Sequence, residues 1–110
     1  IVGRDKDLII SGGFNVYPKE VETALDALPG VVESAVIGLP HPDFGEGVAA
    51  VVVPEPGAAL AEDAVIAAVT DQLAKFKRPK RVFFADALPR NAMGKVQKAE
   101  LRKRHADAFV

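Results

Sequence analysis

The N-terminal part of the chain has the pattern of two short strands around a turn. Residues 8–10 form a β-type apolar run, and residues 14–17 follow with alternating character. Between these segments, residues 11–13 read Ser-Gly-Gly, which predicts a hairpin turn or a sharply bent loop. Because glycine has no side chain, a ligand could also approach the backbone closely at this point.

Three helices are predicted, two of them from apolar residues at helical spacing. The first begins at Pro18, which suits a first helical position, and ends before Pro29 and Gly30. Its apolar stripe follows the spacing i, i+3, i+4, i+7 and consists of Val21, Ala24, Leu25 and Leu28. The second helix begins at Glu62 and Asp63, and its stripe consists of Val65, Ile66, Val69 and Leu73. A last helix is predicted from residue 96 to about residue 108.

Three further apolar segments predict the strands of the core. Residues 31–39 contain a β-type run, residues 48–53 are continuously apolar as in a buried central strand, and residues 82–84 form the third segment. Residues 40–47, between the first two, are rich in Pro and Gly and predict a loop. The order of elements predicts an α+β fold in a single domain of residues 1–110, with a small mixed sheet, flanking helices and an N-terminal β-hairpin.

The composition is that of an ordinary globular domain. The 110 residues are 49% hydrophobic and 26% charged, which suffices for one hydrophobic core. The absence of cysteine excludes disulfides, thiolate metal sites and a cysteine nucleophile, and two histidines argue against a multi-histidine metal site. The sequence contains no apolar run as long as a membrane span and no basic-then-apolar leader, so we expect a cytoplasmic protein. Because the chain begins at Ile1, we expect a segment of a longer polypeptide.

The net charge of −1 conceals two oppositely charged parts of the chain. Residues 1–70 contain three Lys or Arg against 11 Asp or Glu, whereas residues 71–110 contain 11 Lys or Arg against four Asp or Glu. The densest basic segment, residues 75–81, has five cations in seven positions. This segment has three interpretations: a solvated basic face, a site for a phosphate-bearing ligand, or part of a nucleic-acid-binding module formed by residues 75–104.

The polar segment that ends in Lys95 carries the most specific chemical signal. Gly94 directly precedes Lys95, so the backbone can adopt unusual dihedral angles and the ammonium can extend toward phosphate or carboxylate oxygens. The segment is not a P-loop, because Pro89 stands where that motif has glycine and Val96 where it has Ser or Thr. A solvated loop lysine is the alternative interpretation.

Two phenylalanines are candidates for stacking on a planar ligand. Phe44 lies in the segment rich in Pro and Gly, where an anchor in the core is the alternative, and Phe76 has cations on both sides. No Ser/His/Asp set and no pair of carboxylates can be argued from the spacing. The candidate chemistry is therefore that of binding phosphates and aromatic rings.

Two segments resemble motifs of the adenylate-forming enzymes, which comprise acyl- and aryl-CoA synthetases, peptide-synthetase adenylation domains and luciferases. Residues 3–22, Gly-Arg-Asp-Lys-Asp-Leu-Ile-Ile-Ser-Gly-Gly-Phe-Asn-Val-Tyr-Pro-Lys-Glu-Val-Glu, resemble their hinge-and-loop motif. Residues 89–96, Pro-Arg-Asn-Ala-Met-Gly-Lys-Val, resemble their C-terminal catalytic-lysine motif. The resemblance spans essentially the whole chain. In residues 12–22, 40–47 and 93–98, the sequence is most similar to malonyl-CoA synthetases.

The resemblance implies that the chain is the small, mobile C-terminal domain of such an enzyme. The family joins a carboxylic acid to ATP as an acyl-adenylate with release of pyrophosphate, and the thiol of CoA then displaces AMP. The small domain swings between two orientations on a large N-terminal domain, one for each step. That large domain would hold most of the ATP and acid pocket and the Mg²⁺ that accompanies ATP, so we expect this chain to be inactive alone.

The same resemblance assigns roles by matching position. Lys95 matches the lysine that contacts the carboxylate and phosphate oxygens during adenylation, where a preorganised cation stabilises developing charge. Lys6 matches the hinge about which the domain rotates, and Arg4 matches the arginine near the adenylate ribose. Gly13 matches the glycine whose backbone lines the pantetheine tunnel, which a side chain would narrow.

A further set of positions matches the site that holds the CoA nucleotide in some aryl-CoA synthetases. Phe44, Phe76 and Arg78 form this set, since stacking and phosphate contacts fit their chemistry. Some relatives have Trp where Phe44 stands. The neighbouring Lys77, Lys80 and Arg81 could also attract the phosphates of CoA.

The resemblance favours malonate as the acid, because it is most similar to malonyl-CoA synthetases. The alternatives are another acyl-CoA synthetase or an adenylation domain that serves a carrier protein, and, outside the family, the nucleic-acid-binding module. Lys95 also resembles a site of reversible acetylation in bacterial CoA synthetases, which makes a lysine acetyltransferase an expected partner. We expect no metal site, nucleic-acid partner or membrane contact on this chain.

Overall fold

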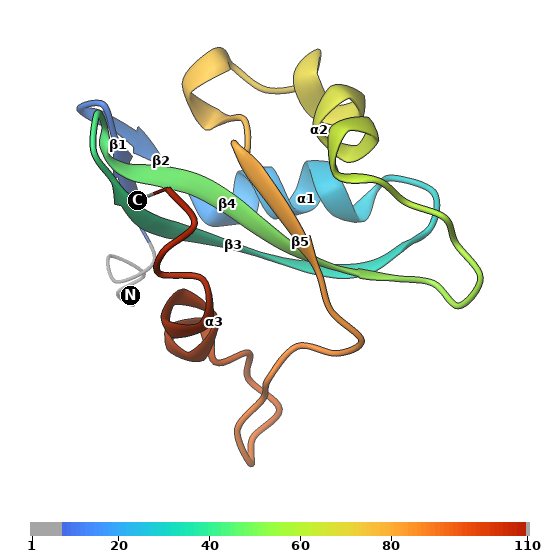
Figure 1. Cartoon of the computed structure of the whole chain (residues 1–110). Helices are drawn as coiled ribbons and strands as arrows, with labels where there is room; N and C mark the ends of the chain where they lie inside the picture. Colours follow the sequence, from blue (N-terminus) through green and yellow to red (C-terminus); the bar gives the residue numbers. More distant parts are fainter. Residues whose placement is uncertain (1–7, 110) are drawn as a thin grey trace.

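The structure, a computed structural model, describes residues 8–109 (Figure 1). The elements in this part of the chain follow the predicted order of strands and helices, with one short 3-10 helix in addition. The strands are β1 (Ile9–Ser11), β2 (Phe14–Val16), β3 (Val31–His41), β4 (Gly45–Pro54) and β5 (Arg81–Phe84). The helices are α1 (Pro18–Asp26), α2 (Glu62–Thr70), the 3-10 helix η2 (Lys75–Lys77) and α3 (Lys98–Arg104).

The five strands form one mixed sheet, as predicted. Its order is β2-β1-β4-β3, and these neighbours are antiparallel. β5 pairs in parallel with β4. β3 pairs with β4 along nearly its whole length and has no other strand partner in the described residues, so β3 is an edge of the sheet.

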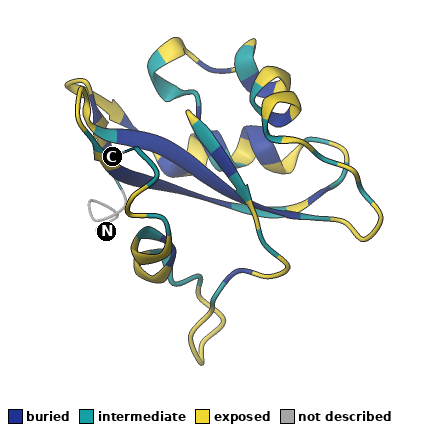
Figure 2. Cartoon of the chain, in the orientation of Figure 1, coloured by how far each residue is buried: buried dark blue, intermediate teal, exposed yellow. Residues whose placement is uncertain are grey.

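Helices cover both faces of the sheet. Figure 1 shows α1 and α2 on one face and α3 on the other. On β4, Val48, Ala50 and Val52 belong to the core cluster that includes buried residues of α1 and α2. The alternate residues of β4, Ala49, Val51 and Val53, belong to the cluster that includes Leu101 of α3. A strand with both faces covered must be apolar at every position, which explains the continuous apolar run of residues 48–53 (Figure 2).

The expected loop over residues 40–47 is wrong in extent. β3 continues to His41 and β4 begins at Gly45, so only the three residues between them form the turn. Pro40 pairs with Glu46 at the end of the edge strand, where proline's missing N–H is tolerated. Gly45 has a φ of +78°, which closes the turn in a conformation that suits glycine.

The predicted last helix is also shorter than expected. α3 comprises Lys98–Arg104, and the residues that follow it form turns. Val96, expected inside the helix, instead pairs with Arg90 in an isolated antiparallel bridge. The segment 82–84 is a strand, but only Val82 is buried, and Phe84 at its end is 39% exposed. In the described part of the chain, no helix has the length and apolar character needed to cross a membrane.

Candidate functional site: an aromatic groove and a lysine loop

A groove of about 320 Å³ forms where the β1–β2 hairpin, the β3–β4 turn and the η2 segment meet. Its lining residues are Ser11, Gly12, Phe14, Phe44, Lys75, Phe76 and Lys80. They come from three segments that are distant in sequence, and the fold of the sheet brings them together. The groove combines aromatic walls with two cations, a combination that suits a ligand with a planar ring and anionic groups.

The aromatic walls of the groove leave ring surface accessible to a ligand. Phe14 and Phe76 stack with their centroids 4.7 Å apart and an interplanar angle of 27°. The Nζ of Lys80 lies 4.3 Å from the centroid of the Phe44 ring, in a cation–π contact. Phe14 is 56% exposed and Phe44 is 39% exposed, so both retain open surface. Phe44 is therefore not the core anchor that the alternative interpretation proposes.

Two glycines shape the hairpin that forms one side of the groove. Gly12 and Gly13 have φ values of +58° and +85°, and the Gly12 N–H donates to the Phe44 carbonyl at 2.9 Å. A Cβ on Gly12 would lie 3.2 Å from the Phe44 ring, whereas a Cβ on Gly13 would meet nothing within 4 Å. The positive φ of Gly13 therefore favours glycine at this position, although no atom of the described chain would contact a Cβ there.

The basic segment 75–81 divides into paired and groove-lining cations. Lys77 forms an ion pair with Glu20 at 2.9 Å, and Arg81 forms one with Glu62 at 2.7 Å. The Nε of Arg78 donates to the Leu73 carbonyl at 3.1 Å, and Arg78 does not line the groove. Lys75 and Lys80 line it instead, so the cationic side of the groove consists of these two lysines.

The structure brings Phe44, Phe76 and Gly12 together in the groove, whereas neither Gly13 nor Arg78 lines it. It adds Phe14 and Lys75, which the sequence pattern does not single out. Phe14 lies on β2 with its side chain exposed, and only the pairing of the hairpin with the η2 segment shows what it contacts. Lys75 belongs to the basic cluster, but its neighbours in sequence do not distinguish it from Lys77.

Lys95 stands in a separate, tightly hydrogen-bonded loop. The Arg90–Val96 bridge closes the loop at its base, and Gly94 adopts a φ of +82° directly before Lys95. The Oδ1 of Asn91 accepts hydrogen bonds from the N–H groups of Met93 at 2.9 Å and Lys95 at 3.0 Å. Lys95 itself is exposed and takes part in none of the ion pairs found among residues 8–109. Its ammonium is therefore available to an anionic ligand.

The lysine loop and the groove lie far apart on the domain. Figure 1 shows the β1–β2 hairpin and the η2 segment toward the upper end of the view, and the 89–97 loop at the lower end. The two sites therefore present different surfaces of the domain to any ligand.

Two expected site residues, Arg4 and Lys6, lie outside the described residues, so their roles stay predictions. Within residues 8–109, no group of three or more His, Asp or Glu side chains is arranged to hold a metal ion.

Comparison with known families and proteins identifies relatives that cover most of this chain. The sequence model of the AMP-binding enzyme C-terminal domain family matches residues 20–95. A 3-[(3aS,4S,7aS)-7a-methyl-1,5-dioxo-octahydro-1H-inden-4-yl]propanoyl:CoA ligase from Rhodococcus jostii (strain RHA1) is 57% identical over 103 residues, 94% of this chain and 20% of that protein. A feruloyl-CoA synthase from Amycolatopsis sp is 49% identical over 104 residues, 94% of this chain and 21% of that protein. The chain thus spans about a fifth of the length of these curated relatives.

Solved structures match the fold closely. ATP-bound MatB from Rhodopseudomonas palustris superposes with a TM-score of 0.95 and 62% identity, over 98% of this chain and 22% of that chain. A fatty acyl CoA synthetase from Mycobacterium tuberculosis superposes with a TM-score of 0.86 and 46% identity, over 94% of this chain and 20% of that chain.

Proposed function

Since the chain belongs to the AMP-binding enzyme C-terminal domain family, we propose that it is the mobile C-terminal domain of an AMP-forming acid–CoA ligase. In the proposed full-length ligase, this domain (residues 1–110) is joined to a large N-terminal domain, and ATP, a carboxylic acid and CoA are the substrates. The single observation that best supports this proposal is the separation of two sites on one small domain. A domain that presents Lys95 in one orientation and the aromatic groove in another can serve two successive steps.

In the first step, Lys95 acts on the reacting carboxylate and the α-phosphate of ATP. Negative charge accumulates on these oxygens as the acid attacks and pyrophosphate departs. Hydrogen bonds hold the backbone at Lys95, so its exposed ammonium would extend from a fixed point toward these oxygens, where a cation lowers the barrier. We assign to Lys95 no proton transfer, only this electrostatic stabilisation.

In the second step, the aromatic groove receives the nucleotide end of CoA. The adenine ring would pack against the aromatic side chains that line the groove, among them Phe44 and the half-buried Phe76, and Lys75 and Lys80 would contact the phosphates. Arg78, whose Nε donates to the Leu73 carbonyl, would add positive charge from outside the groove lining. Gly13 would line the pantetheine tunnel, and the open space beside its Cα is consistent with a second wall from the large domain.

Malonate is the proposed acid. The similarity to MatB and to malonyl-CoA synthetases in residues 12–22, 40–47 and 93–98 supports it. The curated relatives are named for bulkier acids, such as the indenyl-propanoate and ferulate, so this domain alone supports only the class of carboxylic acids. Lys6 is proposed as the hinge, and Arg4 as a contact of the adenylate ribose.

Reversible acetylation of Lys95 is proposed as a means of regulation. Lys95 is exposed, and acetylation removes the charge that adenylation needs. The intact mass of the protein after treatment with a lysine acetyltransferase, followed by peptide mapping, tests this point. Acetylation confined to other lysines would exclude it. The nucleic-acid alternative has less support, because Lys77 and Arg81 of the basic segment are already paired with carboxylates.

The proposal is tested by Lys95→Ala in the full-length ligase, with the two half-reactions measured separately. Pyrophosphate release from ATP and acid reports adenylation, and preformed acyl-adenylate with CoA reports thioester formation. We expect adenylation to fall by about a hundredfold to a thousandfold while thioester formation persists. Lys19→Ala, which removes an exposed lysine from α1, is the control and leaves both steps unchanged. Unchanged adenylation in Lys95→Ala would refute the proposed role.

A further inference from the structure

The peptide groups on both sides of Lys95 are held by hydrogen bonds from its own loop. The Lys95 N–H donates to Asn91 Oδ1 at 3.0 Å, and the Lys95 carbonyl accepts from the Asn91 N–H at 3.0 Å. The Gly94 carbonyl, in the peptide that precedes Lys95, accepts from Nη1 of Arg90 at 2.8 Å. Together these contacts fix the direction in which the Lys95 side chain leaves the backbone.

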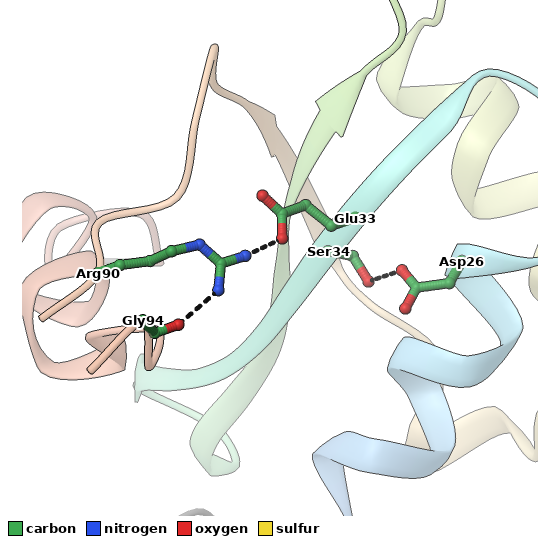
Figure 3. Close-up of polar contacts among 5 residues, drawn as sticks. All are labelled: Asp26, Glu33, Ser34, Arg90 and Gly94. Carbon is green, nitrogen blue, oxygen red and sulfur yellow. Dashed lines mark hydrogen bonds and ion pairs between the residues drawn. The ribbon is translucent and has the colours of Figure 1, made fainter. Parts of the chain in front are cut away.

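Arg90 connects this loop to the sheet. While Nη1 bonds the Gly94 carbonyl, Nη2 forms an ion pair and hydrogen bond with the Glu33 carboxylate on β3 (Figure 3). The guanidinium group is planar and its donors have fixed directions, so the two contacts set the position of Gly94 relative to the strand. A lysine at this position would present a point charge and could not impose the same geometry.

Glu33, which contacts Arg90, lies at an irregularity in β3. The β3–β4 register shifts between Val31 and Glu33, as at a β-bulge, and the intervening Val32 is 54% exposed. Such irregularities redirect side chains and occur often beside functional sites. The anchor of the Lys95 loop therefore stands on β3 at this register shift, and it is separated from Arg90 by 57 residues in sequence.

We infer that Arg90 is a positioning residue for Lys95. Glu33 anchors Arg90 to the sheet, and Asn91 also holds the loop through its hydrogen bonds. This inference rests on the proposed role of Lys95 in adenylation. Transition-state stabilisation by a fixed cation depends steeply on where that cation lies. Arg90 and Glu33 therefore serve the adenylation step through Lys95, and they have no part in thioester formation.

The test uses the proposed full-length ligase with Arg90→Met, Arg90→Lys, Glu33→Gln and the double variant Arg90→Met/Glu33→Gln. We expect Arg90→Met to lower the adenylation kcat by about tenfold to a hundredfold, with a smaller loss in Glu33→Gln and incomplete rescue by Arg90→Lys. The KM for ATP and the rate of thioester formation from preformed acyl-adenylate stay unchanged. Because Glu33 acts through Arg90, the double variant is no slower than Arg90→Met alone.

Arg104→Met and Glu100→Gln are the matched controls. They disrupt an exposed ion pair of the same type, 3.5 Å long and within α3, and we expect neither half-reaction to change. Equal losses in both half-reactions would show that Arg90 only supports the fold, and additive losses in the double variant would show that Glu33 does not act through it. Either result overturns the inference.

Lys95→Ala separates the failure of this inference from the failure of the proposed function. If Lys95→Ala abolishes adenylation and Arg90→Met does not impair it, the positioning role of Arg90 is refuted and the proposed function stands. If Lys95→Ala leaves adenylation intact, the catalytic role of Lys95 and the inference that depends on it both fall.

Discussion

Glu22 of α1 and Lys98 of α3 form an ion pair 2.7 Å long although the two helices cover opposite faces of the sheet. The pair lies at the edge of β3, where the Glu22 carboxylate also accepts the Val36 N–H at 2.9 Å. The two side chains are only 15% and 16% exposed. Close by, Ser34 Oγ donates to Asp26 at 2.7 Å (Figure 3). The edge strand is thus occupied by side chains, which disfavours pairing with another chain.

Loss of Glu22 should destabilise the domain more than loss of Lys98. Glu22→Ala leaves both the Val36 N–H and the Lys98 ammonium without a partner, and we expect a cost of about 2–4 kcal/mol in the free energy of unfolding. Lys98→Met keeps the apolar stem and the Glu22–Val36 hydrogen bond, so its cost should be about 1 kcal/mol. Urea unfolding of the 110-residue chain measures both. Equal costs would show that Val36 does not depend on Glu22.

Glu62 should make the stability of the domain sensitive to acid. The Val82 N–H and then the Arg81 guanidinium lower the pKa of the Glu62 carboxyl below its ordinary value of 4.5, against a smaller opposing effect of burial. A lowered pKa contributes stability that is fully present above about pH 4.5 and is lost as the pH falls through the folded value. Glu62→Gln should therefore be less stable than wild type at neutral pH. The difference should vanish in acid, and a constant difference across the titration would contradict this assignment.

His105 should act in a different pH window. Its ring stacks on Phe83 at 4.0 Å and 9°, and burial, followed by the charges of Arg104 and Arg81, lowers its pKa below 6.5. The unfolded chain then takes up the proton first, so stability declines as the pH falls below about 6.5. His105→Phe keeps a stacked ring without a titrating group. Urea unfolding between about pH 8 and about pH 5 should give a flatter profile for the variant, and parallel profiles would exclude His105 as the source.

Lys80 and Lys77 offer a matched pair for testing the cationic side of the groove. Lys80 lines the groove, whereas Lys77 already pairs with Glu20. In the thioester-forming half-reaction of the proposed full-length ligase, Lys80→Met should raise the KM for CoA by about tenfold. Lys77→Met should change it much less. Similar increases in both variants would mean that the groove responds only to overall charge.

The order of elements and most of the core follow from local patterns in the sequence. The spacing of the apolar stripe in residues 21–28 predicts which side of α1 is buried. The continuous apolar run 48–53 predicts a strand buried on both faces. The full length of the β3–β4 hairpin is not predicted. Residues 40–47 are rich in Pro and Gly, which indicates a loop, and the pairing of these residues depends on a partner strand that local sequence does not identify. α3 likewise ends before its predicted limit, and the ring of His105, which follows it, stacks on Phe83, a contact that is not local in sequence.

The candidate site is only partly predictable for the same reason. Lys95, Phe44 and Phe76 stand out through local chemistry and through resemblance to a family. Phe14 becomes part of the groove only because the hairpin folds against η2. The Arg90–Glu33 contact joins residues 57 apart in sequence, and no local pattern indicates it. Contacts between segments distant in sequence therefore add residues to both sites that local sequence patterns do not predict.

The proposal that the two sites serve separate steps is tested most directly by Lys95→Ala and Phe76→Ala, each assayed in both half-reactions of the proposed full-length ligase. We predict a crossed pattern. Lys95→Ala lowers adenylation by about a hundredfold or more and spares thioester formation, whereas Phe76→Ala raises the KM for CoA by about tenfold and spares adenylation. If both variants impair the same half-reaction, the lysine loop and the groove do not serve separate steps, and the two-site mechanism is contradicted.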